Sequence, residues 1–593
     1  MTIQATVNGN RPKGKTNPPP LCGGSGGAPQ WKFVALMDRR QLMATGLGAA
    51  WATIACQPAG QSANSHIGGG FTGAQLDRGH WMRDRLQSGK DWPQPSSVFK
   101  TRVVITGGGV AGLAAARALR QQGIDDFALL ELEDVPGGNS RAGQLGGLAC
   151  PLGAHYLPLP SDDAPEVQDL LEELGVRTRV AGRWQYDERH LCHSPQERLF
   201  FDGEWQEGLL PMQGVGADTL AQYQRFATLV EQARTTTRWT IPIQNGPPAL
   251  VQSGLAAITF IAYLDQNGLN DAHLRWYLDY CCRDDYGAGI ATVSAWAGIH
   301  YFASRHGFHV PGGESGEREG LLTWPEGNAW LTRQLATPLG ERLHTGRVVV
   351  RIAHTQHGVE VDAFNTANQT LERWQAQRAV VALPVFVAAH VVQNPPDFLR
   401  QAARRVVYAP WLVANIHLAS ALHDRPGAPP SWDNVLYDSV KTTPGAAGHG
   451  GLGYVDASHQ RLQAQPGATV LTHYRALGDY AGNVGRAVLL TRPWAAWRDE
   501  ILAELSLAHP DLVAKATAVD ITRYGHAMAI PVPQANGQIG LWPPSNMRKQ
   551  LSKIERYPPR QVLAWERLRF AHSDWAGYSV FEEAFTAGHW AVG

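Results

Sequence analysis

Residues 101–123 read TRVVITGGGVAGLAAARALRQQG, and this stretch decides the fold. The β-branched run that opens it predicts a buried strand, and the Ala- and Leu-rich run that follows predicts a helix. The motif Gly107-x-Gly109-x-x-Gly112 therefore lies where a strand leads into a helix. This context predicts an α/β fold with a doubly wound parallel sheet and a dinucleotide bound at its edge.

Each glycine of the motif has a separate task in such a fold. Gly107 permits the tight turn, Gly109 lets a pyrophosphate approach the backbone, and Gly112 lets the helix pack against the strand. The helix begins at Val110 and Ala111, and its N-terminus favours the anionic pyrophosphate.

A second predicted strand, FALLEL, carries Glu131 at its end. A carboxylate at this place accepts hydrogen bonds from both ribose hydroxyls and repels a 2′-phosphate, which disfavours NADP. Glu133 is the alternative ribose ligand. The glycine motif does not by itself separate FAD from NAD.

The segment that follows the second strand, ELEDVPGGNSR at 131–141, resembles the flavin amine oxidase and phytoene desaturase superfamily. In that family an acidic strand end is followed by a Gly-Gly pair, and the pair and a nearby Arg lie along the FAD pyrophosphate. The resemblance assigns these roles to Gly137, Gly138 and Arg141. It implies FAD as cofactor, held by a Rossmann-like domain that is interwoven with an α+β substrate domain.

Two later segments resemble the same family. GRVVVRIAH, a polar turn and a strand ending at Pro384 match its adenine-binding strands, with the Val349 backbone on the adenine and Ile352 beside it. Near the end of the chain, Asp574 takes the place of the acidic residue at the ribityl–phosphate region. Glu583 replaces the glycine of the usual Glu-Gly-Ala motif, and this departure changes the contacts expected at the flavin ring.

These matches divide the chain into alternating segments. We predict, in order, a disordered extension and export signal at 1–56, an N-terminal extension at 57–98, FAD-binding parts at 99–160, 319–390 and 531–593, and substrate-domain parts at 161–318 and 391–530.

The N-terminal segment contains Arg39-Arg40 before a short apolar run, and it resembles a Tat export signal. Thr53-Ile-Ala-Cys56 resembles a lipobox, which would make Cys56 a lipid anchor. Met37 directly precedes this segment and is an alternative start. The resemblance implies a periplasmic protein, and the alternative is a chance Arg-Arg pair before a buried helix.

Charge and cysteine content narrow the function classes. Lys plus Arg and Asp plus Glu both number 52, so no basic field favours nucleic acid. The six cysteines form no zinc pattern. The adjacent Cys281 and Cys282 are either a redox disulfide or two buried thiols.

Three apolar segments with embedded polar rings lie between the flavin motifs. They contain His155 and Tyr156, then Trp296, His300 and Tyr301, then Tyr524, His526 and Met528. We predict His155, Tyr156, Trp296 and the C-terminal Tyr578 as catalytic-site residues. The alternative for each is a core aromatic ring with satisfied polar atoms.

Taken together, the DDYG, SAWAGIHYFAS and GHAMA segments resemble bacterial spermidine dehydrogenase-related proteins, which couple FAD to a b-type haem. The resemblance makes His80 and His526 candidate ligands of a haem iron. The chain has no CxxCH motif, which excludes covalently attached c-type haem.

The resemblance implies hydride transfer from a C–H bond beside nitrogen to flavin N5, followed by hydrolysis of the imine. A small amine, with a polyamine as one option, is the expected substrate, and a periplasmic or membrane component is the expected electron acceptor. Asp284 and Asp285 are candidate cation anchors. The family's lysine after the strand ending in Pro384 is missing. Its cage tyrosine aligns best with Val580, although Tyr578 and Trp575 are close. Desaturation of an apolar substrate and a non-catalytic electron-transfer flavoprotein therefore stay open as alternatives.

Overall fold

The strand predicted at the glycine motif lies at the centre of an eight-stranded mixed sheet, and the predicted helix follows it, in the computed structural model, which describes residues 64–192, 196–246, 250–310, 320–438, 450–461, 466–542 and 562–593. The central strand β2 (Ser97–Thr106) pairs in parallel with β3 (Phe127–Leu130) on one side and β15 (Thr370–Val381) on the other. All three end at the same edge, which is where the glycine motif begins. The remaining strands of this sheet are β12 (Leu343–His344), β13 (Arg347–His354), β14 (Val359–Asn365), β21 (Leu563–Trp565) and β22 (Leu568–Phe570).

Helices cover both faces of this sheet, so the predicted doubly wound α/β fold is confirmed. One face packs against α2 (Val110–Gln121), α3 (Pro165–Glu173), α9 (Ala329–Ala336) and α17 (Phe581–Trp590). The other face packs against α1 (Leu76–Gln87), α10 (Val385–Val391) and α11 (Asp397–Arg405).

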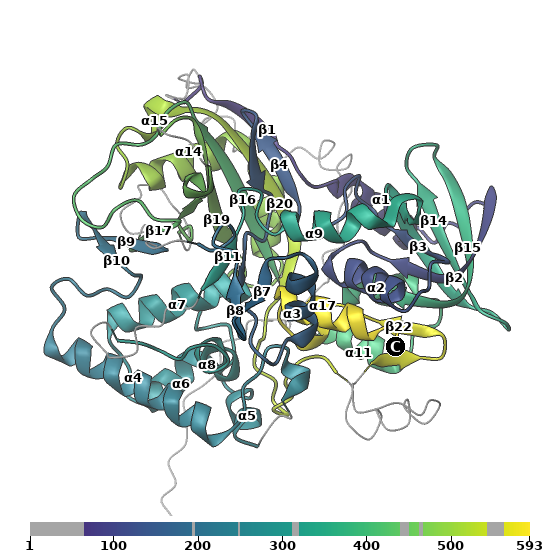
Figure 1. The fold of residues 1–593 in the computed structure, drawn as a ribbon, viewed down its shortest axis with the longest axis horizontal. Helices are drawn as coiled ribbons and strands as arrows, with labels where there is room; N and C mark the ends of the chain where they lie inside the picture. The colour runs from purple at the N-terminus through teal and green to yellow at the C-terminus, as the bar shows by residue number, and fades with distance from the viewer. Residues whose placement is uncertain are drawn as a thin grey trace, which may run out of the picture. The chain divides into compact units, whose positions relative to one another are not determined.

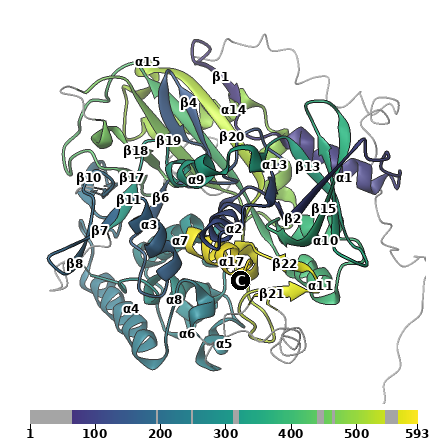
Figure 2. The ribbon, with the colours of Figure 1, turned by 45° about the vertical axis from the view of Figure 1, so that its right-hand side comes forward.

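The two helices nearest the glycine motif, α2 and α17, lie side by side (Figure 2). A Cβ atom added to Gly588 on α17 would lie 2.0 Å from the Ala111 carbonyl oxygen on α2. The backbones therefore approach so closely that only glycine fits at this contact. The C-terminal helix is thus held directly against the helix that begins at the glycine motif.

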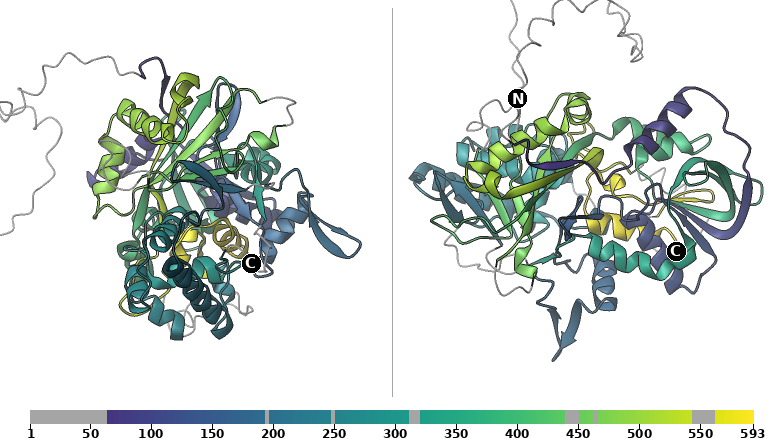
Figure 3. Two further views of the ribbon diagram at one scale, coloured as in Figure 1. Left: turned by 90° about the vertical axis from the view of Figure 1, so that its left-hand side faces the viewer. Right: turned by 90° about the horizontal axis from the view of Figure 1, so that it is seen from above.

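A second sheet has eight strands in the order β1-β20-β16-β19-β18-β17-β9-β10 and is mostly antiparallel. It lies beside the first sheet (Figures 1 and 3). Its strands are β1 (Gly68–Phe71), β9 (Glu197–Phe201), β10 (Glu204–Glu207), β16 (Tyr408–Leu418), β17 (Asp433–Leu436), β18 (Tyr454–Asp456), β19 (Thr469–Ala476) and β20 (Ala516–Ala529).

Helices also cover both faces of the second sheet. The largest apolar core lies between the sheet and α4 (Ala217–Thr236), α5 (Leu250–Leu255), α6 (Phe260–Gln266), α7 (Ala272–Tyr286) and α8 (Ala295–Ala303). The opposite face packs against α13 (Val484–Thr491), α14 (Trp494–Ser506) and α15 (Leu512–Lys515). Short strand pairs complete the structure: β4 (Ala142–Leu145) with β5 (Leu148–Pro151), β6 (Tyr156–Pro158) with β11 (Leu321–Thr323), and β7 (Arg177–Val180) with β8 (Arg183–Tyr186).

The chain passes repeatedly between the two sheets, so the first sheet draws its strands from widely separated parts of the sequence. This is the predicted interweaving of a Rossmann-like domain with an α+β domain. The extension before the first FAD-binding segment contributes β1, which pairs with β20 of the second sheet. The export-signal prediction, with Arg39, Arg40 and Cys56, lies outside the described residues.

Two further features bear on the sequence predictions. Cys281 and Cys282 are buried thiols on α7 and form no disulfide, which agrees with the second of the two alternatives. Within the residues that the structure describes, no helix combines the length and the apolar character that a membrane span requires.

Candidate active site

The glycine motif forms a turn without side chains between β2 and α2. Gly107 has φ +96°, and a Cβ atom on it would lie 2.3 Å from the Ala382 carbonyl oxygen. A Cβ atom on Gly112 would lie 1.8 Å from the Gly107 carbonyl oxygen. Both positions therefore require glycine, one for the turn and one for the packing of the helix on the strand. Gly109, by contrast, faces space, because its Cβ would meet only the Gly138 Cα, at 3.9 Å.

The Gly-Gly pair lies against this turn. Gly137 forms a parallel bridge with Gly109, and its N–H donates to the Gly108 carbonyl at 2.8 Å. Gly137 and Gly138 have φ values of +128° and +59°, which favour glycine. No side chain caps α2 at Gly109, so the N–H groups at Val110 and Ala111 face the cradle. An uncapped helix N-terminus beside side-chain-free backbone fits a pyrophosphate.

Glu131 is buried at the end of β3, and both of its carboxylate oxygens accept backbone N–H groups. Oε2 accepts from Gly108 at 2.6 Å and Oε1 from Glu133 at 2.8 Å. Burial raises the pKa of Glu131. The carboxylate is fixed beside the glycine turn, where a ribose adjacent to the pyrophosphate would lie.

Glu133, the alternative ribose ligand, is instead paired with Arg141, whose Nη1 lies 3.3 Å from Glu133 Oε2. The Arg141 Nε also donates to the Gly138 carbonyl at 2.9 Å. Arg141 thus lies on the Gly-Gly pair, as its predicted role requires. Between the two glutamates, the geometry favours Glu131 as the ribose ligand.

Val349 lies on β13, near the end of β3. The pairing of β13 with β14 shifts register between Val349 and Arg351, which marks a β-bulge there. The Arg347 N–H donates to the Glu131 carbonyl at 2.7 Å, so this strand begins next to the ribose candidate. The strand that carries Val349 is thus tied to Glu131 at Arg347, two residues before Val349.

Asp574 is fully buried at the other end of the site, before α17. Its Oδ2 accepts the Val385 N–H at 2.9 Å and the Tyr408 hydroxyl, and Oδ1 lies 3.2 Å from His572 Nδ1. His572 and these hydrogen bonds lower the pKa of Asp574, although burial alone would raise it. The side chain therefore carries a negative charge that fixes the first turn of α10.

Glu583 does not turn toward the glycine cradle. Its Oε1 accepts the Ile243 N–H at 2.7 Å and the Tyr578 hydroxyl at 2.8 Å, and the residue is 2% exposed. Burial raises the pKa of Glu583 to about 7. The residue that replaces the family's glycine thus directs its carboxyl into the helical part of the molecule.

Tyr578 belongs to an aromatic cluster with Trp296 and His300. Its ring centroid lies 5.3 Å from that of His300 and 6.1 Å from that of Trp296, and the two latter rings stack at 4.5 Å. Burial lowers the pKa of His300 to about 3, so the ring is neutral. Trp239 also packs on this cluster, with centroids 6.5 Å from Trp296, and sequence reasoning missed it because it follows a helix with no motif.

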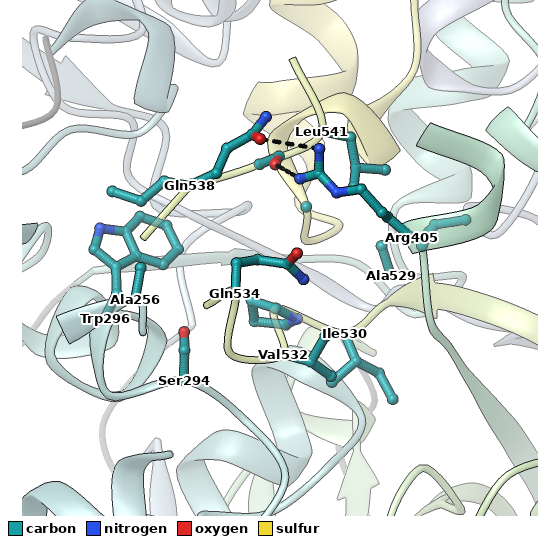
Figure 4. Close-up of a pocket in the computed structure, with 15 residues that line it drawn as sticks. Ala256, Ser294, Trp296, Arg405, Ala529, Ile530, Val532, Gln534, Gln538 and Leu541 are labelled. Atoms are coloured by element: carbon teal, nitrogen blue, oxygen red, sulfur yellow. Dashed lines mark hydrogen bonds between the residues drawn. The ribbon is translucent and has the colours of Figure 1, made fainter. Parts of the chain in front are cut away.

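Trp296 also lines a cavity (Figure 4). The cavity has about 410 Å³ of space between protein atoms, part of it open to solvent. Its wall is mostly apolar, with the Arg405 guanidinium held by Gln538 Oε1 at 2.9 Å and the Gly540 carbonyl at 3.1 Å. Gly577, next to Tyr578, borders it as well. The cavity is therefore bordered by Trp296 of α8 and, in the C-terminal segment, by the residue next to Tyr578.

His155 and Tyr156 form a second aromatic cluster. The His155 ring stacks on Tyr474 with centroids 4.3 Å apart and lies 5.3 Å from Trp432 and 5.0 Å from Tyr156. Burial lowers the pKa of His155 to about 3, so this histidine is neutral. A cavity with about 290 Å³ of space borders His155 and Trp432.

Half-buried carboxyl groups adjoin this second cluster. The Tyr156 hydroxyl lies 3.4 Å from Asp284 Oδ2, and the Tyr280 hydroxyl lies 3.3 Å from Asp433 Oδ2. Burial and the neighbouring Asp285 raise the pKa of Asp284 to about 7. Burial, Asp284 and Glu197 raise the pKa of Asp433 well above its usual range.

The two predicted cation anchors differ in their surroundings. Asp285 is paired with Arg305 at 3.1 Å, whereas Asp284 forms no ion pair of this kind with the residues that the structure describes. Asp284 is also partly exposed, as a group that lines internal space would be. Sequence reasoning missed Asp433 because it lies on β17, next to Glu197 of β9 in the sheet register, and neither belongs to a motif.

Burial lowers the pKa of His80 and His526, the candidate haem ligands. The positive charge of Arg486 lowers both pKa values further. Arg486 Nη1 lies 2.9 Å from His526 Nε2. Because an arginine can only donate, His526 Nε2 is the acceptor and its lone pair is engaged. Among the described residues, no group of at least three His, Cys, Asp or Glu side chains is placed to hold a metal ion.

Comparison with known proteins agrees with this geometry. Residues 110–592 match the family model described as flavin containing amine oxidoreductase. A Baeyer-Villiger monooxygenase from Penicillium patulum is 37% identical over 100 residues, which is 16% of each chain. The chain thus spans about a sixth of the length of the curated relatives it matches.

Two solved structures share the fold over most of the chain. Putrescine oxidase bound to putrescine has a TM-score of 0.58 at 16% identity, covering 84% of this chain and 98% of that one. Cyclohexylamine oxidase from Brevibacterium oxydans has a TM-score of 0.57 at 18% identity, covering 83% and 98%. At these identities the likeness shows the fold alone.

Proposed function

Since the chain belongs to the flavin-containing amine oxidoreductase family, we propose that it is an FAD-dependent dehydrogenase or oxidase that removes a hydride from the C–H bond beside an amine nitrogen. The glycine cradle, with Glu131, Arg141 and Val349 around it, is the proposed binding site for FAD. Bound FAD supplies the hydride acceptor, and the protein orients the substrate.

We further propose that the substrate carries a second cationic nitrogen, as diamines and polyamines do. The observation that carries this proposal is the pair of carboxyl groups, Asp284 and Asp433, beside the aromatic cluster of His155 and Tyr156. An ammonium ion that enters this cluster would find carboxylate acceptors and aromatic faces, and both stabilise a cation. Putrescine, the ligand named for one solved structure of this fold, is a diamine.

The reacting nitrogen needs the opposite environment. An amine donates hydride only when its nitrogen is neutral, and a buried apolar site lowers the pKa of an ammonium group. Trp296, Tyr578 and the neutral His300 provide such a wall, because burial keeps charge out of it. We therefore assign binding of the distal cation to Asp284 and Asp433, and desolvation of the reacting amine to the aromatic wall.

The first test uses the visible spectrum of the purified FAD-loaded protein before and after anaerobic addition of spermidine. We expect the flavin bands to bleach with spermidine and to bleach far more slowly with hexylamine, which lacks the second nitrogen. Equal rates for the two amines would overturn the assignment of Asp284 and Asp433. If no amine bleaches the flavin bands, the amine oxidation proposal is wrong. Such a result would favour hydrogen removal from an apolar substrate or a non-catalytic role.

Haem b remains a prediction that rests on the sequence resemblance. As placed, His526 offers an iron only its Nδ1, because Nε2 accepts from Arg486. The described residues thus do not fit a ready ligand pair, and no step is assigned to haem. A Soret band in the same spectrum would support haem b. If protein produced with haem available shows no such band, the haem prediction is wrong.

We also propose that the Arg39-Arg40 segment directs Tat export and that Cys56 carries a lipid. Mass spectrometry of the N-terminus from a bacterial host tests both points. We expect processing immediately before Cys56 with a lipid mass added, and a Cys56→Ala variant that is no longer retained in the membrane fraction. An intact N-terminus in the cytoplasm would contradict this proposal.

A further inference from the structure

Glu583 joins two parts of the molecule that are far apart in the sequence. It lies in the first turn of α17, the helix that packs on α2 at the glycine cradle. Its Oε1 accepts the N–H of Ile243, which is 340 positions away in the loop that follows α4. The same oxygen accepts the Tyr578 hydroxyl at 2.8 Å. One buried carboxyl group therefore connects the cofactor-side helix to the helical part of the substrate domain.

The loop at 239–243 is held from its other side by the aromatic cluster. His300 Nε2 lies 3.1 Å from the Thr240 carbonyl, which only accepts, so Nε2 carries the proton and donates. Thr240 Oγ1 in turn donates to the Pro242 carbonyl at 2.8 Å. The loop is thus fixed between Glu583 and His300, and Trp239 at its start packs against Trp296 and His300.

Tyr578 is in contact with the same cluster. Its ring is fully buried between His300 and Tyr286, with centroid distances of 5.3 and 6.0 Å. A buried hydroxyl without a hydrogen-bond partner is unfavourable, so the bond to Glu583 decides the orientation of the Tyr578 ring. Rotation of this ring would change the wall that it forms with Trp296.

We propose that Glu583 is a positioning residue for the amine reaction. It fixes the Tyr578 ring and the 239–243 loop, so that the aromatic wall of Trp296, Tyr578 and His300 keeps a fixed position relative to α17. This proposal rests on the proposed amine oxidation for its kinetic consequence only. Its structural content, a clamp between α17 and the loop, does not depend on the substrate.

The hydrogen-bond pattern also indicates which form of Glu583 does this. Both donors point at Oε1, which leaves Oε2 to carry a proton in the neutral acid. A glutamine at this position presents the same carbonyl oxygen to both donors, whereas an alanine presents none. The Gln variant should therefore preserve the clamp, and the Ala variant should break it.

The matched control is Glu166, another buried carboxyl that holds α17. Its Oε1 accepts the Trp590 Nε1–H at 2.8 Å, at the opposite end of the helix from Glu583. Replacing Glu166 by Ala removes this acceptor and disturbs the anchoring of α17 without reaching Tyr578 or the loop. This control variant distinguishes a general loss of stability at α17 from a specific loss of the clamp between Glu583 and the loop.

The experiment compares the FAD-loaded full chain as wild type, E583Q, E583A and E166A by hydrogen–deuterium exchange and by spermidine kinetics. We expect peptides covering 239–246 to exchange at least about tenfold faster in E583A, because the Ile243 N–H loses its acceptor, and to stay protected in E583Q and E166A. KM for spermidine should rise about tenfold in E583A and stay within about twofold in E583Q.

The outcomes separate this proposal from the proposed function. Unchanged exchange at 239–246 in E583A would overturn the clamp, whatever the substrate. Faster exchange with unchanged kinetics would overturn the positioning role and leave only a structural one. Loss of protection in E583Q as well would show that the charge, rather than the acceptor oxygen, holds the loop. A wild-type flavin that spermidine does not reduce would count against amine oxidation, while the exchange result would still decide the clamp.

Discussion

Tyr156 and Asp284 are 128 positions apart in the chain, yet the tyrosine hydroxyl lies 3.4 Å from the aspartate Oδ2. Tyr156 follows the segment after the Gly-Gly pair, and Asp284 lies on α7 of the helical region. Their contact places a half-buried carboxyl group at the point where the FAD-binding part of the chain meets the substrate domain. The proposed recognition of a second cationic nitrogen depends on this juxtaposition.

We expect Asp284→Asn to raise KM for spermidine by about ten- to a hundredfold, because a charge-assisted hydrogen bond contributes about 1.5 to 3 kcal/mol. KM for hexylamine should change little, since it has no second cation. Steady-state kinetics with both amines measure the ratio. Equal losses for the two amines would indicate that Asp284 acts on the reacting nitrogen or on the fold.

The binding of a dication should also depend on pH. The pKa of Asp284 is raised to about 7, so its carboxylate exists above this value and is lost as pH falls through it. A bis-quaternary ammonium inhibitor does not titrate, and we expect its Ki to rise by roughly tenfold per pH unit below about 7.

The control for this titration is the Asp284→Asn variant, which has no carboxyl at that position and should show a flatter profile. A wild-type Ki that is constant from about pH 5 to pH 8 would contradict the role of this carboxyl group.

Two glycine substitutions should separate cofactor binding from folding. Gly109→Ala adds a Cβ that would meet only the Gly138 Cα, at 3.9 Å, so the apoprotein should keep its Tm while FAD affinity falls. Gly112→Ala adds a Cβ 1.8 Å from the Gly107 carbonyl oxygen, so it should destabilise the apoprotein. Thermal unfolding and FAD titration of both variants test this pair. Normal FAD binding in Gly109→Ala would mean that the pyrophosphate does not lie at this turn.

Glu583→Gln should change stability in a pH-dependent manner. The folded-state pKa is about 7 against an ordinary value of 4.5, so the folded protein binds this proton more tightly than the unfolded chain. This tighter proton binding stabilises the folded protein fully below about pH 4.5. The contribution is lost as pH rises through about 7, which lowers the free energy of unfolding by about 3 kcal/mol.

A glutamine does not ionise, so E583Q should have a Tm about 2 to 3 °C above wild type at pH 8 and no advantage at pH 5. Differential scanning calorimetry at the two pH values measures this. An equal shift at both pH values would mean that the carboxyl does not titrate in this range, and the neighbouring Glu582, which also raises the pKa, would then need separate replacement.

The FAD cradle could be predicted because its signals are local. A turn that requires glycine at Gly107, and a helix that must touch a strand at Gly112, leave their marks within a few residues of each other. Glu131 could be placed at a strand end by periodicity alone. Tyr156 and Trp296 were found as polar rings in apolar segments, and Tyr578 by its closeness to the family's cage-tyrosine position, but the sequence could not say which of them meet.

Glu583 shows the limit of such reasoning. Its position in the C-terminal motif predicts a place near the flavin ring, because a family glycine lies there. The direction of its carboxyl depends on Ile243, in a loop that no local pattern connects to α17. Asp433 likewise gains its meaning only from the pairing of β17 with β9 and from Tyr280 on α7.

The sequence by itself determined the doubly wound fold, the order of its segments and the residues around the FAD cradle, because backbone conformation and short-range periodicity decide them. Only the tertiary structure decided the carboxyl cluster at Asp284 and Asp433 and the clamp at Glu583. Those sites bring together side chains from helices and strands that are distant in the chain, and burial shifts the pKa of their carboxyl groups toward neutrality. Burial is a property of the packed chain, and no single segment of sequence carries it.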